Sequence, residues 1–212
     1  VANFQNGFSN ISVPSVLATL VSDELHFPNL SMVGVDDRAA AHTAVAHLIA
    51  QGHSKIAVLG GPTTSFPSRM RRLGAQDAME QAGLTFDDRL YGLSNYDFES
   101  AYHAMNSLLA RRAEFTALFA MSDVIAFGAI RALVSAGFRV PQDVSVIGFD
   151  GITMSRYCVP VMTTIVQPSE QIALQSIELL INQIEHGAPA QTITLQPELQ
   201  QGESVCPCRH PL

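Results

Sequence analysis

Short apolar runs alternate along the chain with longer stretches in which apolar residues recur every three or four positions. Runs such as Lys55–Gly61 and Phe115–Ala120 have the length and continuity of strands buried in a parallel sheet. The longer stretches open at capping residues such as Asp97, and glycines such as Gly137 follow their ends. This order predicts repeated βαβ units and an α/β fold with parallel sheets. Strands are expected at 31–35, 55–61, 90–94, 115–120, 144–149, 163–166 and 192–195, and helices at 37–50, 68–81 and 169–186, with two more opening at 97 and 123.

The most informative single segment is Val140–Gly151, which reads VPQDVSVIGFDG. A turn leads into a buried strand, and the carboxylate of Asp150 stands where that strand ends. Open α/β sheets bind ligands outside the carboxyl ends of their strands, so Asp150 lies where a small molecule would be recognised. An ionised carboxylate only accepts hydrogen bonds, which suits a polyhydroxylated ligand. On position alone, an Asp that caps a loop is an equally good interpretation.

Composition narrows the class of protein. Hydrophobic residues make up 47% and charged residues 15% of the 212 positions, which is typical of a packed globular fold. The net charge of −7 repels phosphate backbones, so we expect no DNA binding by this chain alone. No apolar run approaches the roughly 18 residues of a membrane span, and the first ten residues do not resemble a signal peptide. A cytoplasmic protein without membrane contact is therefore expected.

The sequence gives little support for a metal site, a redox pair or an enzymatic activity. Cys206 and Cys208 form C-P-C, which we interpret as incidental thiols in an exposed tail rather than a metal or redox pair. His42, His47 and His53 are five and six residues apart, unlike metal ligands one helical turn apart, and are expected at the surface or at a lobe edge. None of the common dinucleotide, phosphate-loop, zinc-protease or nucleophile-elbow motifs occurs, so no enzyme and no cofactor are expected.

Seven strings between about Val13 and Ser204 resemble the lac repressor family of bacterial transcription regulators, in its effector-binding core. The resemblance as a whole extends over about nine-tenths of the chain. Each alone also occurs in periplasmic sugar-binding proteins, but together they are specific. The strings are VGVDDRAAAHTAVAHLIAQGHSKIAVLGGP, RMRRLG, YDFESAYHAM, TALFAMSDVIAFGAIRAL, VPQDVSVIGFDG, VPVMTTIVQPSEQIALQSIELL and PELQQGES.

The resemblance implies an α/β fold of two doubly wound parallel-sheet lobes, of periplasmic-binding-protein type I, with a ligand crevice between them. It places the N-terminal lobe at 1–53 plus 166–187 and the C-terminal lobe at 54–165 plus 188–212. Against the family pattern, a helix-turn-helix head, a hinge helix and the first βα units are absent from this chain. The first lobe is therefore expected to be incomplete at its N-terminus, with Val1–Phe4 the end of one strand and Val13–Leu20 the next.

Arg71 is the strongest candidate partner for Asp150. It lies early in a predicted helix, and its guanidinium offers five donors in a fixed fork. An Arg that donates and an Asp that accepts can together hold neighbouring hydroxyls of a sugar. From the residues alone, a solvated helix face like that of Arg69 and Arg72 is the better interpretation. The resemblance reverses this, because the family's effector-binding Arg falls on Arg71 by its R-x-x-G spacing to Gly74.

Five further residues complete the expected ligand site. Ser122 follows a strand at a helix N-terminus, where the family commonly has Asn, so this contact would use one hydroxyl instead of an amide. The resemblance puts an aromatic wall of the pocket at Tyr96, which would stack on the apolar face of a sugar, and a polar contact from the first lobe at Thr19. Phe66 is a loop aromatic that could line the mouth, and Gln167 lies on a crossover beside the crevice.

These features predict the effector-binding core of a lac repressor family regulator. It would bind a small molecule, by preference a neutral sugar, and change operator affinity through a head region outside this chain. A homodimer is expected from the family. A periplasmic sugar-binding protein of an import system is the alternative, and an upstream signal peptide would distinguish it. A hydrolase with a doubly wound fold is a third hypothesis, which is disfavoured because this sequence contains no nucleophile motif. Asp123 is expected to be a helix cap or an inter-lobe contact, and Phe98 to lie in the core.

Overall fold

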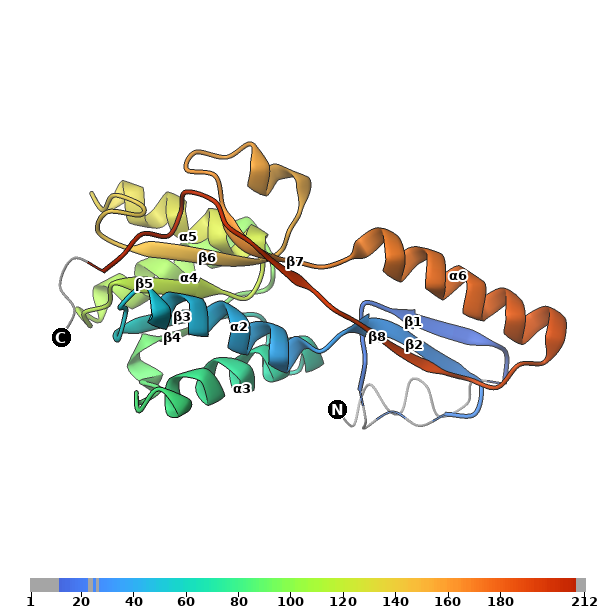
Figure 1. Ribbon diagram of the computed structural model, residues 1–212. Coiled ribbons are helices and arrows are strands. Elements are labelled where there is room, and N and C mark those ends of the chain that lie inside the picture. Colours follow the sequence, from blue (N-terminus) through green and yellow to red (C-terminus); the bar gives the residue numbers. More distant parts are fainter. Residues whose placement is uncertain (1–11, 23–24, 26, 209–212) are drawn as a thin grey trace. The chain divides into compact units, whose positions relative to one another are not determined.

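The computed structural model describes residues 12–22, 25 and 27–208, and the chain divides into two compact units (Figure 1). Unit 1 comprises residues 1–36 and 167–197, and unit 2 comprises residues 37–166 and 198–212. Each unit has its own parallel sheet with helices packed against it, which confirms the α/β class. The predicted strand end at Val1–Phe4 lies outside the described residues.

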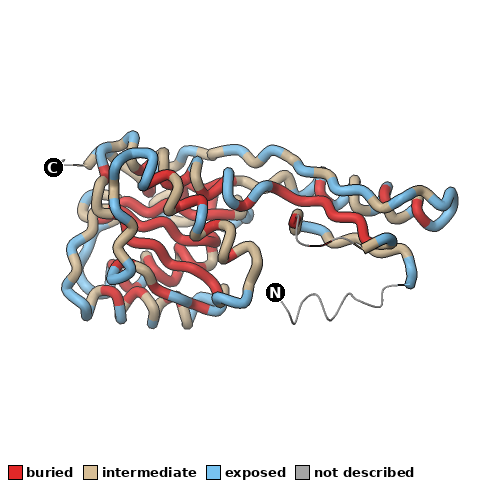
Figure 2. The backbone as a smooth tube through the Cα atoms, turned by 90° about the horizontal axis from the view of Figure 1, so that it is seen from below, coloured by how far each residue is buried: buried red, intermediate tan, exposed pale blue. Residues whose placement is uncertain are grey.

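Unit 2 is built on a six-stranded sheet in the order β4-β3-β5-β6-β7-β9. The first five strands are parallel, and β9 adds an antiparallel edge against β7. All residues of β3 and β5 are buried, because helices cover both faces of the sheet; Figure 2 shows these central strands as a continuous buried layer. The strands are β3 (Ile56–Gly60), β4 (Tyr91–Leu93), β5 (Ala117–Ala120), β6 (Ser145–Asp150), β7 (Thr163–Val166) and β9 (Glu198–Gln200).

Two pairs of helices cover this sheet. The pair α2 and α3 lies on one face, and the pair α4 and α5 lies on the other (Figure 1). Gly74 allows α3 to approach α2 closely, since a Cβ atom there would stand 2.0 Å from the backbone oxygen of Arg38. Large apolar side chains such as Phe119 and Phe149 fill the space between the layers. The helices are α2 (Asp37–Ala50), α3 (Phe66–Gln81), α4 (Phe98–Ala110) and α5 (Asp123–Ser135), with 3₁₀ turns at η1 (Asp88–Leu90) and η2 (Thr153–Arg156).

In the described part of unit 1, a three-stranded parallel sheet in the order β1-β2-β8 packs against helix α6. Val33, Ile172 and Leu179 form its small core. Gly187 ends α6 in the left-handed conformation, with φ of 61°, as the sequence predicts. The elements are β1 (Ser15–Ala18), β2 (Leu30–Val35), β8 (Thr192–Leu195) and α6 (Ser169–His186). A second apolar stripe of α6 is exposed: Leu174, Ile177, Ile181 and Ile184.

The boundaries between the units differ from those expected. The chain passes from unit 1 to unit 2 after Asp36, not near residue 53, and returns to unit 2 after Pro197, not near residue 188. The first difference arises because α2 packs against α3 and against strands β5, β6 and β7. The second arises because β8 pairs in parallel with β2, the central strand of unit 1. The remaining passage between the units falls between Val166 and Gln167.

Several local expectations are also corrected. Helix α3 begins at Phe66 rather than Ser68, because Ser65 is the N-cap and accepts the Ser68 amide at 3.4 Å. Phe98, expected in the core, is 48% exposed in the first turn of α4.

The tail that carries the C-P-C sequence is docked rather than free. His53, expected at the surface or at a lobe edge, is buried and lies 2.9 Å from the Thr116 hydroxyl and 3.0 Å from the Cys206 carbonyl oxygen. The Cys206 amide donates to the hydroxyl of Ser145, and the Cys208 amide donates to a carbonyl beside the end of α2. Among the described residues, no group of three or more His, Cys, Asp or Glu side chains could hold a metal ion.

Candidate functional site

The carboxyl ends of β3, β5 and β6 bring a set of charged side chains together in unit 2. Arg71 extends from α3, Asp37 stands at the start of α2, and Asp150 is the last residue of β6. We call these three residues the Arg71 cluster. Its position agrees with the rule that ligands of open α/β sheets bind beyond the carboxyl ends of the strands.

Arg71 is held on several sides. Its Nε donates to Oδ1 of Asp37 at 2.7 Å, and its Nη1 donates to the carbonyl oxygen of Met121 at 2.5 Å. Nη1 also lies 3.5 Å from Oδ1 of Asp150. The guanidinium stacks over the ring of Phe149, with 3.6 Å between its central carbon and the ring centroid. The side chain is therefore fixed before any ligand arrives, unlike a solvated arginine on a helix surface.

Burial alone would make the charged guanidinium unfavourable, since Arg71 is only 5% exposed. The carboxylates of Asp37 and Asp150 and the nearby phenol of Tyr96 outweigh this desolvation, and the pKa of Arg71 is raised above its usual value. Asp37 is as deeply buried, whereas the side chain of Asp150 is 27% exposed. Water or a ligand can therefore reach part of the Asp150 side chain.

The backbone at Asp150 is unusual. Its φ is 110°, and Gly151 follows with φ of 71°. Residues with a Cβ atom rarely adopt positive φ, and such strain persists only where the surroundings hold it. Gly151 also lies tightly against β7, because a Cβ atom there would be 2.7 Å from Cα of Val166. The turn after β6 therefore sets the direction of the Asp150 side chain.

Asp123 is fully buried beside this turn. Its Oδ1 accepts from the hydroxyl of Thr164 at 2.6 Å, and its Oδ2 accepts from the amide of Ile152 at 2.9 Å. Burial raises the pKa of Asp123 to about 6; these hydrogen bonds oppose the rise, and the charge of Asp150 adds to it. Asp123 is thus not the helix cap. Ser122 is the N-cap of α5, and its Oγ accepts the Ile125 amide at 3.1 Å.

Two expected aromatic residues lie in unit 2. Tyr96 has φ of 60°, and its ring occupies the space above Gly61, where a Cβ atom would be 2.0 Å from Cε2 of the ring. Its hydroxyl is buried and has no hydrogen-bond partner among the described residues. Phe66 is half-buried at the start of α3 and lies beneath the guanidinium of Arg69, with 5.4 Å between the ring centroid and the central guanidinium carbon. Tyr96 therefore adjoins the Arg71 cluster, whereas Phe66 has a partner of its own.

Thr19 and Gln167 belong to unit 1. Thr19 is an exposed turn residue with φ of 68°, whose amide donates to the carbonyl oxygen of Val33. Gln167 directly follows β7, and its carbonyl oxygen accepts the amide of Ser169. Their contribution to a ligand site stays a prediction.

Sequence reasoning missed Asp37 as a site residue and assigned it only to a helix cap. A usable signal was present, because Asp37 follows a buried strand within two residues, much as Asp150 ends one. The role of Asp123 carried no such signal, since its partners come from β7 and from the turn after β6, far along the sequence.

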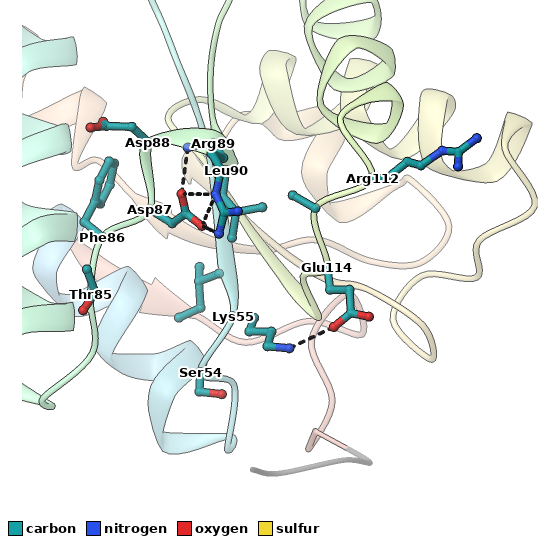
Figure 3. Close-up of a pocket in the computed structure, with 12 residues that line it drawn as sticks. Ser54, Lys55, Thr85, Phe86, Asp87, Asp88, Arg89, Leu90, Arg112 and Glu114 are labelled. Carbon is teal, nitrogen blue, oxygen red and sulfur yellow. Dashed lines mark hydrogen bonds and ion pairs between the residues drawn. The ribbon is translucent and has the colours of Figure 1, made fainter.

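An open pocket of about 790 Å³ lies at the other end of the same sheet (Figure 3). Its residues precede β3, β4 and β5, so it is at the amino ends of the strands. Four of its charged side chains pair with each other, Lys55 with Glu114 and Arg89 with Asp87, each at 2.9 Å or less. Nothing in it matches the buried, oriented groups of the Arg71 cluster, which remains the stronger candidate site.

The Arg71 cluster suits reversible binding rather than bond making. It combines a rigid donor, an accessible acceptor and a nearby aromatic ring, which are the groups that orient a small polar ligand. One guanidinium faces two carboxylates, with Asp123 close by, so the cluster carries no excess of positive charge for a phosphate. No helix in the described part of the chain is long and apolar enough to cross a membrane.

Comparison with known proteins gives consistent results. Residues 45–205 match the family model of the periplasmic binding protein-like domain. Over 201 residues the chain is 34% identical to the HTH-type transcriptional regulator MalR of Clostridium butyricum, covering 94% of this chain and 60% of that protein. The chain thus spans about three-fifths of the length of this relative, which is a transcriptional regulator and not an enzyme.

Solved structures agree. A sugar-binding transcriptional regulator of the LacI family from Escherichia coli, complexed with phosphate, is 30% identical and has a TM-score of 0.81, covering 98% of this chain and 73% of that one. A LacI family regulator from Enterococcus faecium with bound ribose is 25% identical and has a TM-score of 0.83, covering 99% and 76%. This chain therefore belongs to the periplasmic binding protein-like domain family, in the form carried by transcriptional regulators of the lac repressor family.

Proposed function

We propose that this chain binds a neutral, polyhydroxylated effector, most simply a monosaccharide or disaccharide, at the Arg71 cluster. The observation that carries the proposal is the buried guanidinium of Arg71, fixed between Asp37 and Asp150 at the carboxyl ends of the strands. A sugar offers adjacent hydroxyls that donate to one group and accept from another. Asp150 is the exposed acceptor, and Arg71 is the pre-oriented donor.

Tyr96 would supply the stacking face, and Ser122, Phe66, Thr19 and Gln167 would provide further contacts. The phenol of Tyr96 lies close enough to Arg71 to influence its charge, which supports a place at the ligand. The ribose complex of the Enterococcus faecium relative supports a sugar as the ligand class. The negative balance of charge argues against a phosphorylated effector.

In the intact regulator, effector binding would alter the affinity of a separate DNA-binding head for its operator. A ligand shifts such an equilibrium only by its differential affinity for the two conformations. The regulator would act in the cytoplasm as a homodimer. The relatives described above support this assignment over a periplasmic transport protein, because they are transcriptional regulators.

A thermal-shift screen tests the ligand class. The panel contains ribose, glucose, galactose, maltose and cellobiose, with inorganic phosphate, glucose 6-phosphate and adenine as contrasts. A ligand at 100 times its Kd raises stability by about 2.7 kcal/mol, a shift of several degrees. A response only to phosphorylated compounds or to adenine would refute a neutral sugar effector.

Site variants test the location. Arg71→Ala and Asp150→Asn each remove a charge-assisted hydrogen bond worth roughly 1.5–3 kcal/mol, so affinity should fall about 10- to 150-fold. Asp77→Asn is the matched control, because Asp77 also binds an arginine, Arg38, but on an exposed surface. If both site variants bind the panel sugar as tightly as the control, the site lies elsewhere.

A further inference from the structure

The carboxylate of Asp123 connects three neighbouring strand ends of unit 2. The residue opens α5 just after β5, and its two oxygens reach Thr164 in β7 and the amide of Ile152 just past β6. The amide of Gly151 also stabilises the carboxylate. The order β5-β6-β7 in the sheet means that this single side chain crosses above β6.

Gly148 in β6 provides the space for this crossing. A Cβ atom at that position would stand 2.2 Å from Oδ1 of Asp123. Capping does not explain the burial of Asp123, since Ser122 already caps α5. Burying a carboxylate costs free energy unless it accepts good hydrogen bonds, so its two amide partners and Thr164 indicate what holds it there.

Those two amides belong to the residues that directly follow Asp150. The strained φ of Asp150 and the positive φ of Gly151 reverse the chain at this point, and the reversal leaves both amides pointing at one acceptor. The same turn directs the Asp150 carboxylate toward Arg71, with 3.5 Å between Oδ1 and Nη1.

We propose that Asp123 is a positioning residue for effector recognition, which holds the Gly151 and Ile152 amides and thereby aims Asp150 at Arg71 and at the ligand. Asp123 does not touch the ligand itself. The role in recognition rests on the proposed function, whereas the positioning of Asp150 does not. The two claims can therefore be tested separately.

Three variants of the full chain separate positioning from general stability. Asp123→Ala removes the acceptor, whereas Asp123→Asn keeps one acceptor oxygen for the amides and turns its NH₂ toward the Thr164 hydroxyl, which can accept. Ser204→Ala is the matched control, because Ser204 is equally buried and also bonds β6 and β7, at Val146 and Thr163, but near the opposite, amino ends of these strands.

The first measurement needs no ligand. Amide hydrogen exchange by NMR at Gly151 and Ile152 should accelerate at least tenfold in Asp123→Ala, and the Nη proton signal of Arg71 should exchange faster as it loses Asp150. Asp123→Asn should restore slow exchange at all three positions, and Ser204→Ala should leave them unchanged. Unchanged exchange in Asp123→Ala, or equal acceleration in Ser204→Ala, would overturn the positioning role.

The second measurement uses ribose as the probe, by titration calorimetry. Asp123→Ala should weaken binding roughly tenfold or more, and Asp123→Asn by much less. In an Asp150→Asn background the Asp123→Ala change should have little further effect, because Asp123 acts through Asp150. Additive losses would overturn the role in recognition. If ribose fails to bind the wild type, the sugar proposal loses its support for this ligand, and the exchange measurement still decides whether Asp123 positions Asp150.

Discussion

Replacing Asp37 with alanine would remove one of the two carboxylates that face the buried guanidinium of Arg71. The cation would keep the Met121 carbonyl oxygen, the Phe149 ring and the longer contact to Asp150. None of these replaces the 2.7 Å charge-assisted bond from Nε to Asp37. We expect Asp37→Ala to destabilise the protein, because it leaves a charge in the interior with too few partners.

The magnitude follows from the burial of the pair. Their side chains are 7% and 2% exposed, and removing one partner from such a pair costs about 3–5 kcal/mol. Since Asp150 still faces Arg71, we expect a loss of unfolding free energy at the lower end of this range, about 3 kcal/mol. For a chain of this size each kcal/mol corresponds to roughly 2–4 °C, so the Tm should fall by about 6–12 °C.

Urea unfolding followed by circular dichroism measures the effect. Asp77→Ala is the control, since the Arg38–Asp77 pair is 52% and 37% exposed and should contribute at most about 1 kcal/mol. The double variant Asp37→Ala with Arg71→Met removes the stranded charge as well and should be more stable than Asp37→Ala alone. An Asp37→Ala variant no less stable than Asp77→Ala, or a double variant with fully additive losses, would refute the reasoning.

Further outcomes are expected. The pKa of Asp123 is raised from 3.8 to about 6, so the native state binds this proton more tightly than the unfolded state does. The contribution of the bound proton to stability is lost as the pH rises from about 4 to 6. In urea unfolding, the Asp123→Asn variant should therefore be more stable than the wild type by up to about 3 kcal/mol at pH 7, and this difference should vanish near pH 4. Gly74→Ala should lower the Tm by several degrees because its Cβ meets the α2 backbone, whereas Glu80→Ala on the exposed side of α3 should not. Light scattering should show association of the purified chain, and Ile177→Lys with Ile181→Lys on the exposed stripe of α6 should reduce it; a wild type that is already monomeric would contradict this.

Strand and helix positions were predictable because their signals are local. Within the described residues, apolar runs, capping residues and terminal glycines placed the strands from β2 to β8 and the α-helices α2 to α6 to within a few residues. The strand β9 escaped prediction because Leu199 is its single apolar residue, so no apolar run marks it in the sequence. The boundary between the units also escaped prediction. Helix α2 belongs to unit 2 because it packs against α3, and Gly74, which permits this contact, lies 24 or more residues further along the chain.

The candidate site was predictable in part. Strand ends indicated Asp150, and the family resemblance indicated Arg71; the structure places their charged atoms 3.5 Å apart. The burial of Arg71 was not foreseen, since a pattern of arginines on a helix gives no sign of which one turns inward. Tyr96 was expected only as a flat wall, but the position of its ring depends on Gly61 in another loop, which leaves the space that the ring fills.

Each unit is assembled from two stretches of chain separated by the other unit, and this order affects synthesis on the ribosome. The central strand of unit 1, β2, emerges about 160 residues before its partner β8, and β7 waits for β9 to cover its edge. Until then both strands present unpaired backbone groups to other nascent chains. The late arrival of residues 192–200 therefore marks a period in which chaperone binding should protect the growing protein, and translation that stalls before this segment should favour aggregation.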